Sequence, residues 1–202
     1  MFRQQNRHEN NHVDENVSKI DMKEEQIIDG CKLKDSQSQT LLYKQHASIL
    51  FGMARRYTSC DADAKDVLQD AFLKIFDNIG KYNRKGSIRA WMMRIVINEA
   101  LRLYQLHNRH QIENYDDYEE EIVDNSVVVS DTLTHEILLG FIHELPDGYR
   151  MVFNLCEIDG YSYEEVAKML NCTTSTCRSQ LFKAKNTLRK RVNEFNKKEK
   201  FL

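Results

Sequence analysis

Residues 161–192, with the sequence YSYEEVAKMLNCTTSTCRSQLFKAKNTLRKRV, constrain the fold more than any other part of the chain. Ser162 and Glu165 form an S-x-x-E capping box, which satisfies amide groups at the start of one helix. Residues 171–173 are a short polar break, and Thr173 is a good N-cap for a second helix. The spacing therefore predicts a helix-turn-helix.

The second helix of this motif is predicted to have two different faces. Its apolar side recurs at helical spacing and contains Cys177, Leu181, Ala184 and Leu188. The opposite side carries small polar, aromatic and basic side chains, namely Ser175, Ser179, Phe182, Lys183, Asn186 and Lys190. Such a face suits the major groove of DNA, where these groups meet base edges and phosphates. An ordinary amphipathic hairpin with a solvated charged face is the alternative.

Composition extends the helical expectation to the whole chain. With one Pro and seven Gly among 202 residues and 30% charged residues, an all-α protein is favoured. No stretch approaches the ~18 uninterrupted apolar residues that a membrane span needs. The N-terminal sequence also lacks the apolar core of a secretory signal. We therefore expect a cytoplasmic protein with no membrane insertion.

The distribution of charge divides the chain, although the net charge is only −2. Residues 41–110 contain twelve Lys or Arg against six Asp or Glu, and residues 176–200 contain nine against two. Between them, residues 111–135 hold eight acidic residues and no Lys or Arg. This pattern predicts two small helical domains joined by an acidic linker. The expected segments are a disordered tail (1–20), a first domain (21–110), the linker (111–132), a second domain (133–195) and a basic tail (196–202).

Four helices are expected in the first domain. The first is short and carries Ile27, Ile28 and Cys31, and the second runs from about Thr40 to Tyr57. The apolar face expected on the second helix consists of Leu42, His46, Ile49, Leu50, Met53 and Tyr57. The third helix starts at Asp61 and exposes Asp63, Asp66, Gln69 and Asp70 on its polar side.

A basic loop and the helix after it form a second candidate nucleic-acid site. The loop, residues 80–87, has the sequence GKYNRKGS, and Ser87 is expected to cap the fourth helix. One border of that helix carries an aromatic ring, an amide and two guanidiniums, from Trp91, Arg94, Asn98 and Arg102. These groups could stack on bases and hold phosphates. For Trp91 alone, a place in the hydrophobic core is the favoured interpretation.

The second domain is expected to contain four helices, of which the helix-turn-helix supplies the last two. Its first helix runs from about Leu133 to Glu144 and packs apolar side chains from Ile137, Leu138, Phe141 and Ile142. Residues 146–148 (Pro-Asp-Gly) break that helix, and a second one follows until residues 159–160. The last ten residues of the chain, basic and polar, are expected to fray.

The sequence predicts no metal site, no cofactor and no catalytic residue. Its five cysteines are Cys31, Cys60, Cys156, Cys172 and Cys177, with no CxxC and no zinc-site spacing. No glycine-rich phosphate loop and no carboxylate pair beside a nucleophile occur. Packing explains the cysteines better than a redox role, and an enzyme is the least favoured class.

At the level of whole motifs, the chain resembles the bacterial extracytoplasmic-function (ECF) sigma factors. The N-terminal segments DAKDVLQDAFLKIFDNIGKY and GSIRAWMMRIVINEALRLY are similar to sigma region 2. The segment LPDGYRMVFNLCEIDGYSYEEVAKMLNCTTSTCRSQLFKAKNTLRKRV is similar to region 4. The resemblance covers roughly residues 23–192. It implies a non-catalytic subunit that binds core RNA polymerase, at the clamp helices of the largest subunit and at the flap, and directs it to promoter DNA.

The resemblance also implies roles for individual residues. The core-polymerase contact would be made by Asp66, Gln69 and Asp70. The −10 promoter element would be read and melted by Tyr82, Asn83, Lys85, Ser87, Trp91, Arg94, Asn98 and Arg102. The −35 element would be contacted by Thr174, Ser175, Arg178, Ser179, Phe182, Lys183, Asn186 and Lys190. An anti-sigma factor that holds the protein at the membrane is an expected further partner, and no small-molecule substrate is expected.

A different class of function is compatible with the same helix-turn-helix. A two-domain transcription regulator would bind operator DNA tightly without polymerase, whereas a sigma factor should bind weakly until polymerase is present. Promoter preference is expected to be particular to this chain. Gln180 stands where many relatives carry Arg, and Ser175 stands where many carry Gly.

Overall fold

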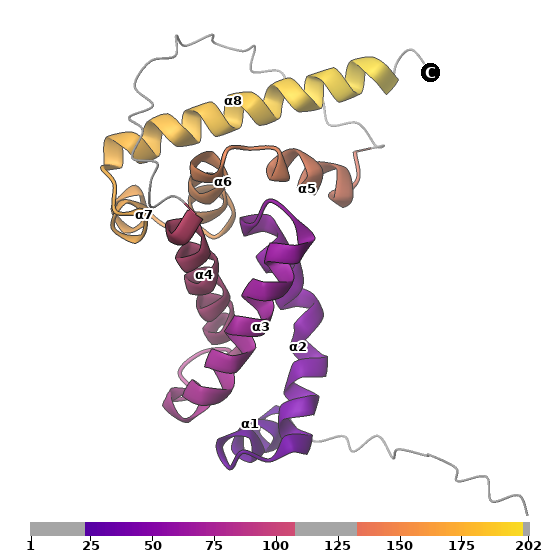
Figure 1. Cartoon of the computed structure of the whole chain (residues 1–202), viewed down its shortest axis with the longest axis vertical. Coiled ribbons are helices and arrows are strands. Elements are labelled where there is room, and N and C mark those ends of the chain that lie inside the picture. The colour runs from indigo at the N-terminus through magenta and orange to yellow at the C-terminus, as the bar shows by residue number, and fades with distance from the viewer. Residues whose placement is uncertain (1–22, 108–132, 200–202) are drawn as a thin grey trace, which may run out of the picture.

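The computed structural model describes residues 23–107 and 133–199, and the regular secondary structure in these two stretches is entirely helical (Figure 1). The all-α expectation is therefore confirmed. The predicted tail over residues 1–20 and the acidic linker over residues 111–132 lie outside the described residues.

The N-terminal unit comprises four α-helices and a short 3₁₀ turn: α1 (Glu24–Lys32), α2 (Ser36–Tyr57), α3 (Asp61–Asn78), η1 (Ile79–Lys81) and α4 (Ile88–His107). α2 packs against α1, α3 and α4, so it forms the centre of this unit. The α3–α4 loop lies beside α1 at the lower end of Figure 1, and α4 leads from there toward the C-terminal unit.

The C-terminal unit comprises α5 (His135–His143), α6 (Asp147–Phe153), η2 (Asn154–Ile158), α7 (Tyr163–Leu170) and α8 (Thr174–Glu199). η2 is a π-helical turn that continues α6. α8 crosses the upper end of the molecule in Figure 1 and packs on α5, α6 and α7. The two units meet where α2 contacts α5 and α6 and where α4 contacts α7.

Side-chain caps explain where several helices begin. Asp35 accepts a hydrogen bond from the amide of Ser38 at 2.7 Å at the start of α2. Ser87 accepts one from the amide of Arg89 at 3.1 Å at the start of α4, as the sequence predicted. Such caps satisfy amides that have no partner within the helix.

The hydrophobic core is continuous between the two units. Its largest fully buried side chains come from both, and they include Tyr57, Leu42, Leu50, Ile75, Met92, Leu155, Val152 and Val166. Among the described residues, no helix has the length and apolar character needed to cross a membrane.

Two expected core faces were partly wrong. Ile49 on α2 is exposed although Leu42, His46, Leu50, Met53 and Tyr57 are buried, because Ile49 lies at the edge of the buried stripe. On α5, Leu138 is exposed and its neighbour Leu139 is buried. A helix as short as α5 shows too few turns for its periodicity to fix which face is buried.

The boundaries around α6 and α8 also differ from the expectation. Asp147 and Gly148 are the first residues of α6 rather than part of a break, and Pro146 occupies its N-cap position. The last ten residues were expected to fray, but α8 continues to Glu199. Phe195 packs against Phe141 of α5 with ring centroids 6.2 Å apart, and Arg191 pairs with Glu144. These contacts with α5 hold the C-terminal half of α8 in place.

Candidate nucleic-acid and polymerase interface

The helix-turn-helix has the geometry that its sequence predicted. Ser162 and Glu165 form the capping box at the start of α7, with the Ser162 amide donating to the Glu165 carboxylate at 2.8 Å. These hydrogen bonds hold the pKa of Glu165 below its usual value. Asn171 ends α7 in the left-handed conformation (φ 53°), and Thr173 accepts from the amide of Thr176 at 3.0 Å at the start of α8. Left-handed residues commonly end helices, and Asn adopts this conformation more readily than most.

The two predicted faces of α8 are present. On the inner side Cys177, Leu181 and Ala184 are buried and Leu188 is half-buried. On the outer side, the side chains that the sequence assigned to the −35 element are exposed or half-exposed. The exposed ones are Ser175, Arg178, Ser179, Phe182 and Lys190, and the half-exposed ones are Thr174, Lys183 and Asn186.

One outer-face residue has an aromatic support that the sequence analysis missed. The guanidinium carbon of Arg178 lies 5.4 Å from the ring centroid of Tyr163, the first residue of α7. Cation–π stacking of this kind restricts where a long side chain points. Tyr163 lies fifteen residues before Arg178 and on a different helix, so no short-range spacing rule links the two residues.

The acidic side of α3 is also at the surface. Asp66 and Gln69 are exposed, as predicted. Asp70 is half-buried and pairs with Arg102 of α4. The structure thus joins a residue expected to contact polymerase with one expected to contact DNA.

The loop between α3 and α4 is tied to the rest of the unit at two points. Tyr82 is only 6% exposed, and its hydroxyl donates to the carbonyl of Gly86 at 2.6 Å. Arg84 adopts a left-handed backbone (φ 62°) and pairs with Asp29 of α1. Three other side chains of the loop assigned to the −10 element are exposed, namely Asn83, Lys85 and Ser87.

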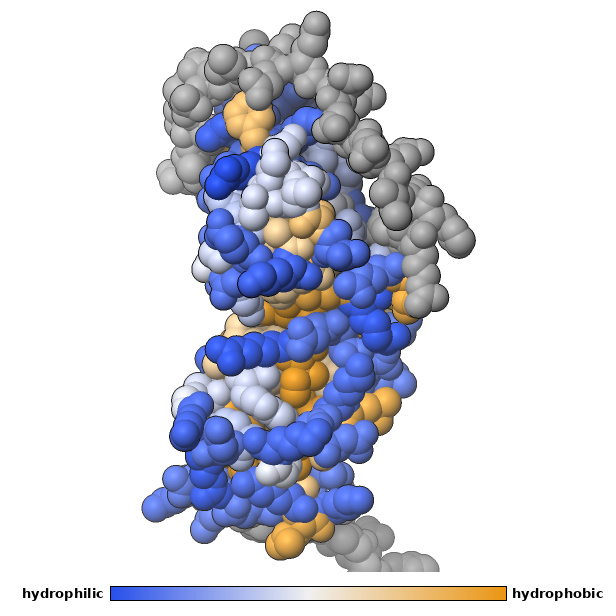
Figure 2. Space-filling model, turned by 90° about the vertical axis from the view of Figure 1, so that its left-hand side faces the viewer, coloured by the Kyte–Doolittle hydropathy of each residue, from blue (hydrophilic) through white to orange (hydrophobic). Residues whose placement is uncertain are grey.

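The predicted DNA-contacting border of α4 contains two exposed side chains and two that contact other side chains. Arg94 and Asn98 are exposed. Trp91 is half-buried and stacks against Tyr82 with ring centroids 5.6 Å apart. Arg102 donates to buried Glu99 at 2.9 Å in addition to its pair with Asp70. The side of the molecule on which α4, α7 and the start of α8 lie is mostly hydrophilic (Figure 2).

Comparison with known proteins identifies these two helical units. The family described as "Sigma-70 region 2" matches residues 42–110, and "Sigma-70, region 4" matches residues 135–188. The chain belongs to the ECF-type RNA polymerase sigma factors. It is a sigma factor that directs transcription.

The sigma factor is similar to curated relatives along most of its length. The ECF RNA polymerase sigma-E factor of Haemophilus influenzae is 25% identical over 178 residues, covering 82% of this chain and 93% of the relative. The sigma-E factor of Escherichia coli K12 is 25% identical and covers 82% and 92%. The sigma factor SigE of Mycolicibacterium smegmatis is 28% identical over 152 residues, covering 73% and 59%.

The chain is also similar to proteins in two solved complexes. The sigma factor RpoE of Bartonella quintana, solved with the anti-sigma factor NepR, is 21% identical with a TM-score of 0.48 and covers 76% of this chain and 96% of that one. CnrH, solved with the cytosolic domain of CnrY, is 20% identical with a TM-score of 0.45 and covers 83% and 96%.

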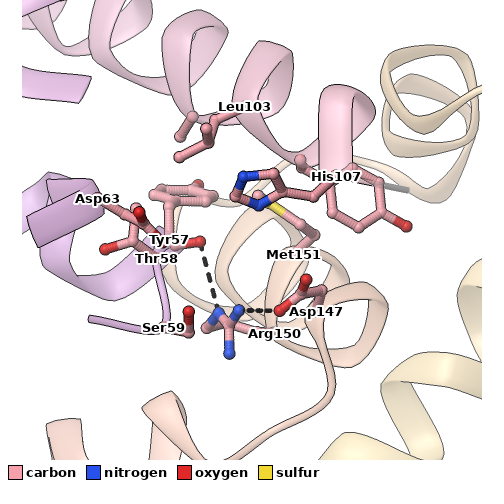
Figure 3. A pocket seen from close by; sticks show the side chains of 11 residues that line it. Tyr57, Thr58, Ser59, Asp63, Leu103, His107, Asp147, Arg150 and Met151 are labelled. Atoms are coloured by element: carbon pink, nitrogen blue, oxygen red, sulfur yellow. Dashed lines mark hydrogen bonds and ion pairs between the residues drawn. The ribbon is translucent and has the colours of Figure 1, made fainter. Parts of the chain in front are cut away.

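A polar site that the sequence analysis missed lies where the two units of the sigma factor meet. Figure 3 shows a recess there, lined from α2 by Tyr57, from α4 by Leu103 and His107, and from α6 by Asp147 and Arg150. Arg150 is only 3% exposed and donates to the carbonyl of Leu145 at 2.7 Å. The sequence signal was a single Arg inside the apolar stretch RMVFNLC, since a buried cation requires several acceptors.

The cysteines and acidic residues form no metal centre in the part of the chain that the structure describes. Cys172 and Cys177 approach each other across the turn, with sulfur atoms 3.5 Å apart. Burial, followed by the contact with Cys172, raises the pKa of Cys177 to about 12. Cys177 is therefore protonated at neutral pH and packs as part of the core.

Proposed function

We propose that this sigma factor binds core polymerase with the exposed acidic side of α3, reads the −10 element with the α3–α4 loop and α4, and reads the −35 element with α8. The observation that carries the proposal is the outer face of α8, which presents hydroxyls, an aromatic ring and cations on a rigid frame. Residues 21–110 and 133–195 would then be separate functional domains.

The proposed −35 contact follows from the length and position of α8. Arg178 and Ser179 are exposed in its first two turns, and they would reach base edges. Lys190 lies twelve residues beyond Arg178, or about 18 Å along the axis at ~1.5 Å per residue. The major groove is only about 12 Å wide. We expect Lys190 to have left the groove and to contact a phosphate.

The proposed −10 contact uses fewer residues than the sequence alone indicated. Asn83, Lys85 and Ser87 are the exposed loop side chains, and Arg94 and Asn98 continue the surface along α4. Holding a flipped base must offset a few kcal/mol of lost stacking and pairing. The half-buried ring of Trp91 could offer one edge or face for this purpose.

The remaining two members of the predicted −10 set are better explained as supports. Tyr82 holds the loop through the Gly86 carbonyl, and Arg102 is engaged by Glu99 and Asp70. We propose that both act by positioning the surface and not by contacting DNA.

The proposed polymerase contact rests mainly on Asp66 and Gln69, which are exposed on α3. Their side chains lie away from the buried stripe of α3, which includes Val67, Leu68 and Ala71. The exposed carboxylate would pair with a basic surface on the polymerase.

The chain is a transcription initiation factor, and we further propose that it has no catalytic activity of its own. It would act in the cytoplasm, where polymerase is found. Membership of the ECF group also favours an anti-sigma factor as a partner that tethers the protein at the membrane.

Run-off transcription with core polymerase on a library of promoter sequences tests the proposal. The expected result is transcription from a defined −35 and −10 pair only when the protein and core polymerase are both present. Tight binding of a palindromic site by the protein alone, with no effect on transcription by core polymerase, would instead support a conventional operator-binding regulator.

A further inference from the structure

A buried carboxylate links α3 and α4 in the N-terminal unit. Glu99 of α4 is only 3% exposed. One of its oxygens accepts a hydrogen bond from the Lys74 ammonium of α3, and the other accepts one from Arg102 Nε of α4 at 2.9 Å. Arg102 also pairs with Asp70 of α3. The four side chains thus form a line of alternating charge, which we name the α3–α4 charge chain.

The α3–α4 charge chain joins the two helices at two points. Asp70 and Lys74 are neighbours one turn apart on α3, and Glu99 and Arg102 are neighbours about one turn apart on α4. A single ion pair would let one helix pivot on the other. Two pairs at different heights oppose both sliding and rotation of α4. The charge chain therefore fixes how α4 is turned on α3.

Apolar side chains already hold these two helices in the core. Ile75 of α3 and Val96 of α4 are both completely buried there. An apolar residue in place of Glu99 would add to that packing, whereas burying a carboxylate removes its hydration. What the carboxylate adds is direction, because charge-assisted hydrogen bonds are strong and weaken when their angles change.

The charge chain lies next to the surface proposed to read the −10 element. Asn98, an exposed member of that surface, directly precedes Glu99 in α4. At the other end of the same border, Trp91 stacks on Tyr82. Turning α4 by about 10° would move the end of a side chain by about 1 Å, since it lies ~5–6 Å from the helix axis. Good hydrogen bonds vary in length by only about 0.5 Å. A small turn of α4 would therefore break a contact made by Asn98.

We propose that Glu99 is a positioning residue for −10 recognition that acts through Asn98, because its bonds to α3 set the direction in which the Asn98 amide meets a base. The inference rests on the proposed function. The amide of Asn98 carries both donors and an acceptor, so it can distinguish bases by hydrogen bonds when its direction is fixed. Glu99 is buried and does not itself contact DNA. Its loss should therefore change which base is preferred.

A double-mutant cycle in the full-length protein tests this role. Its members are Glu99→Gln, which keeps the shape of the side chain and removes its charge, Asn98→Ala, and the two combined. The matched control is Asp77→Asn, which removes a charge from an exposed position of α3. Run-off transcription with core polymerase on single-base promoter variants gives the discrimination at each element. Discrimination is the ratio of product from the preferred base to product from the other bases.

Glu99→Gln and Asn98→Ala should each lower the −10 discrimination several-fold and leave the −35 discrimination unchanged. The double variant should discriminate no worse than Asn98→Ala alone, because Glu99 cannot affect base choice once the amide is gone. The control should equal wild type. Arg102→Lys covers the case in which Glu99→Gln does not fold, since it keeps the charge but lacks the fork that binds two carboxylates. It should lower the −10 discrimination in the same way and have no further effect in the Asn98→Ala background.

Three outcomes would overturn the inference and leave the −10 assignment of α4 intact. The first is unchanged −10 discrimination in Glu99→Gln. The second is an equal loss of product from every promoter, which a merely structural role of Glu99 would cause. The third is multiplication of the two single effects in the double variant. If Asn98→Ala itself keeps the wild-type −10 discrimination, the proposed function of α4 is wrong and this inference is overturned with it.

Discussion

The two surfaces predicted to contact DNA differ in how far the chain itself already uses their polar side chains. In the N-terminal unit, Arg84 pairs with Asp29, and Arg102 binds both Glu99 and Asp70. On the outer face of α8, Arg178 stacks on the ring of Tyr163, and Ser179, Phe182 and Lys190 are exposed.

The difference follows from where each helix lies. α4 packs against α2 and α3 and touches α7, so Arg102 on its border meets the carboxylate of Asp70 on α3. α8 crosses one end of the molecule in Figure 1, and α5, α6 and α7 pack against it from below. A basic residue in sequence is thus a better candidate for DNA contact when its helix lies at the outside of the fold.

The largest expected effect is the loss of polymerase binding on changing Asp66, and it is compared with the same change at Asp70. Asp66→Lys should abolish co-purification with core polymerase and leave the melting temperature unchanged, because Asp66 is exposed. Asp70→Lys should also lower the stability, by at most about 1 kcal/mol, because it places a cation beside Arg102. Pull-down with core polymerase and thermal denaturation measure the two effects. Normal co-purification of Asp66→Lys would remove this face from the docking surface.

The comparison of the two DNA surfaces is sharpened by three single substitutions. Arg178→Ala should reduce the free energy of promoter binding by about 1–3 kcal/mol and relax the base preference at one or two −35 positions. Lys190→Ala should weaken all sequences equally and lower the salt slope by about one. Arg102→Ala should leave the salt slope unchanged, because its charge is already engaged within the protein.

Holoenzyme binding to single-base promoter variants at several salt concentrations provides the measurement for all three. If Arg178→Ala weakens every promoter alike, Arg178 is a phosphate contact. Base reading would then rest on Ser175, Ser179 and Lys183. A lower salt slope for Arg102→Ala would remove the contrast between the two surfaces.

A smaller effect is expected from the aromatic support of Arg178. Tyr163→Leu removes the stacking face and should cost about 0.5–1 kcal/mol of discrimination at the positions that Arg178 reads. Tyr163→Phe keeps the face and should behave as wild type. The measurement is the same set of promoter variants, and equal behaviour of the Leu and Phe variants would show that Tyr163 does not position Arg178.

The smallest expected effect is a loss of stability at low pH, and it should begin at a different pH in each of the two units. Burial lowers the pKa of His46, whose two ring nitrogens lack hydrogen-bond partners among the described residues. The unfolded chain then binds the proton first, so the N-terminal unit should lose stability as the pH falls below 6.5, the ordinary value for His. Glu165 in the C-terminal unit also has a lowered pKa, but its contribution is lost only below its ordinary value of 4.5.

Thermal denaturation between pH 7.5 and 5.5 measures this difference, with hydrogen exchange to assign it to a unit. His46→Leu should remove the pH dependence of the N-terminal unit in that range. An equal loss of protection in both units over the same range would contradict the assignment to His46.

Much of the local structure could be predicted because its determinants lie within one helical turn. The capping box of Ser162 and Glu165 and the caps of Ser87 and Thr173 depend on residues two or three positions apart. Periodicity also located the buried side of α8, since a helix of 26 residues repeats its pattern many times. The same rule was partly wrong for α5, which has only nine residues, since Leu139 is buried and Leu138 is exposed.

The sequence by itself determined that this chain forms helices, where most of them begin, and that one helix-turn-helix presents a polar outer face. The tertiary structure decided which polar residues are available and which are already engaged. The pairing of Asp70 with Arg102, the stacking of Arg178 on Tyr163 and the capping of α2 by Arg150 join residues that are far apart in the chain. Local spacing carries no information about such contacts, because they depend on how whole helices pack against one another.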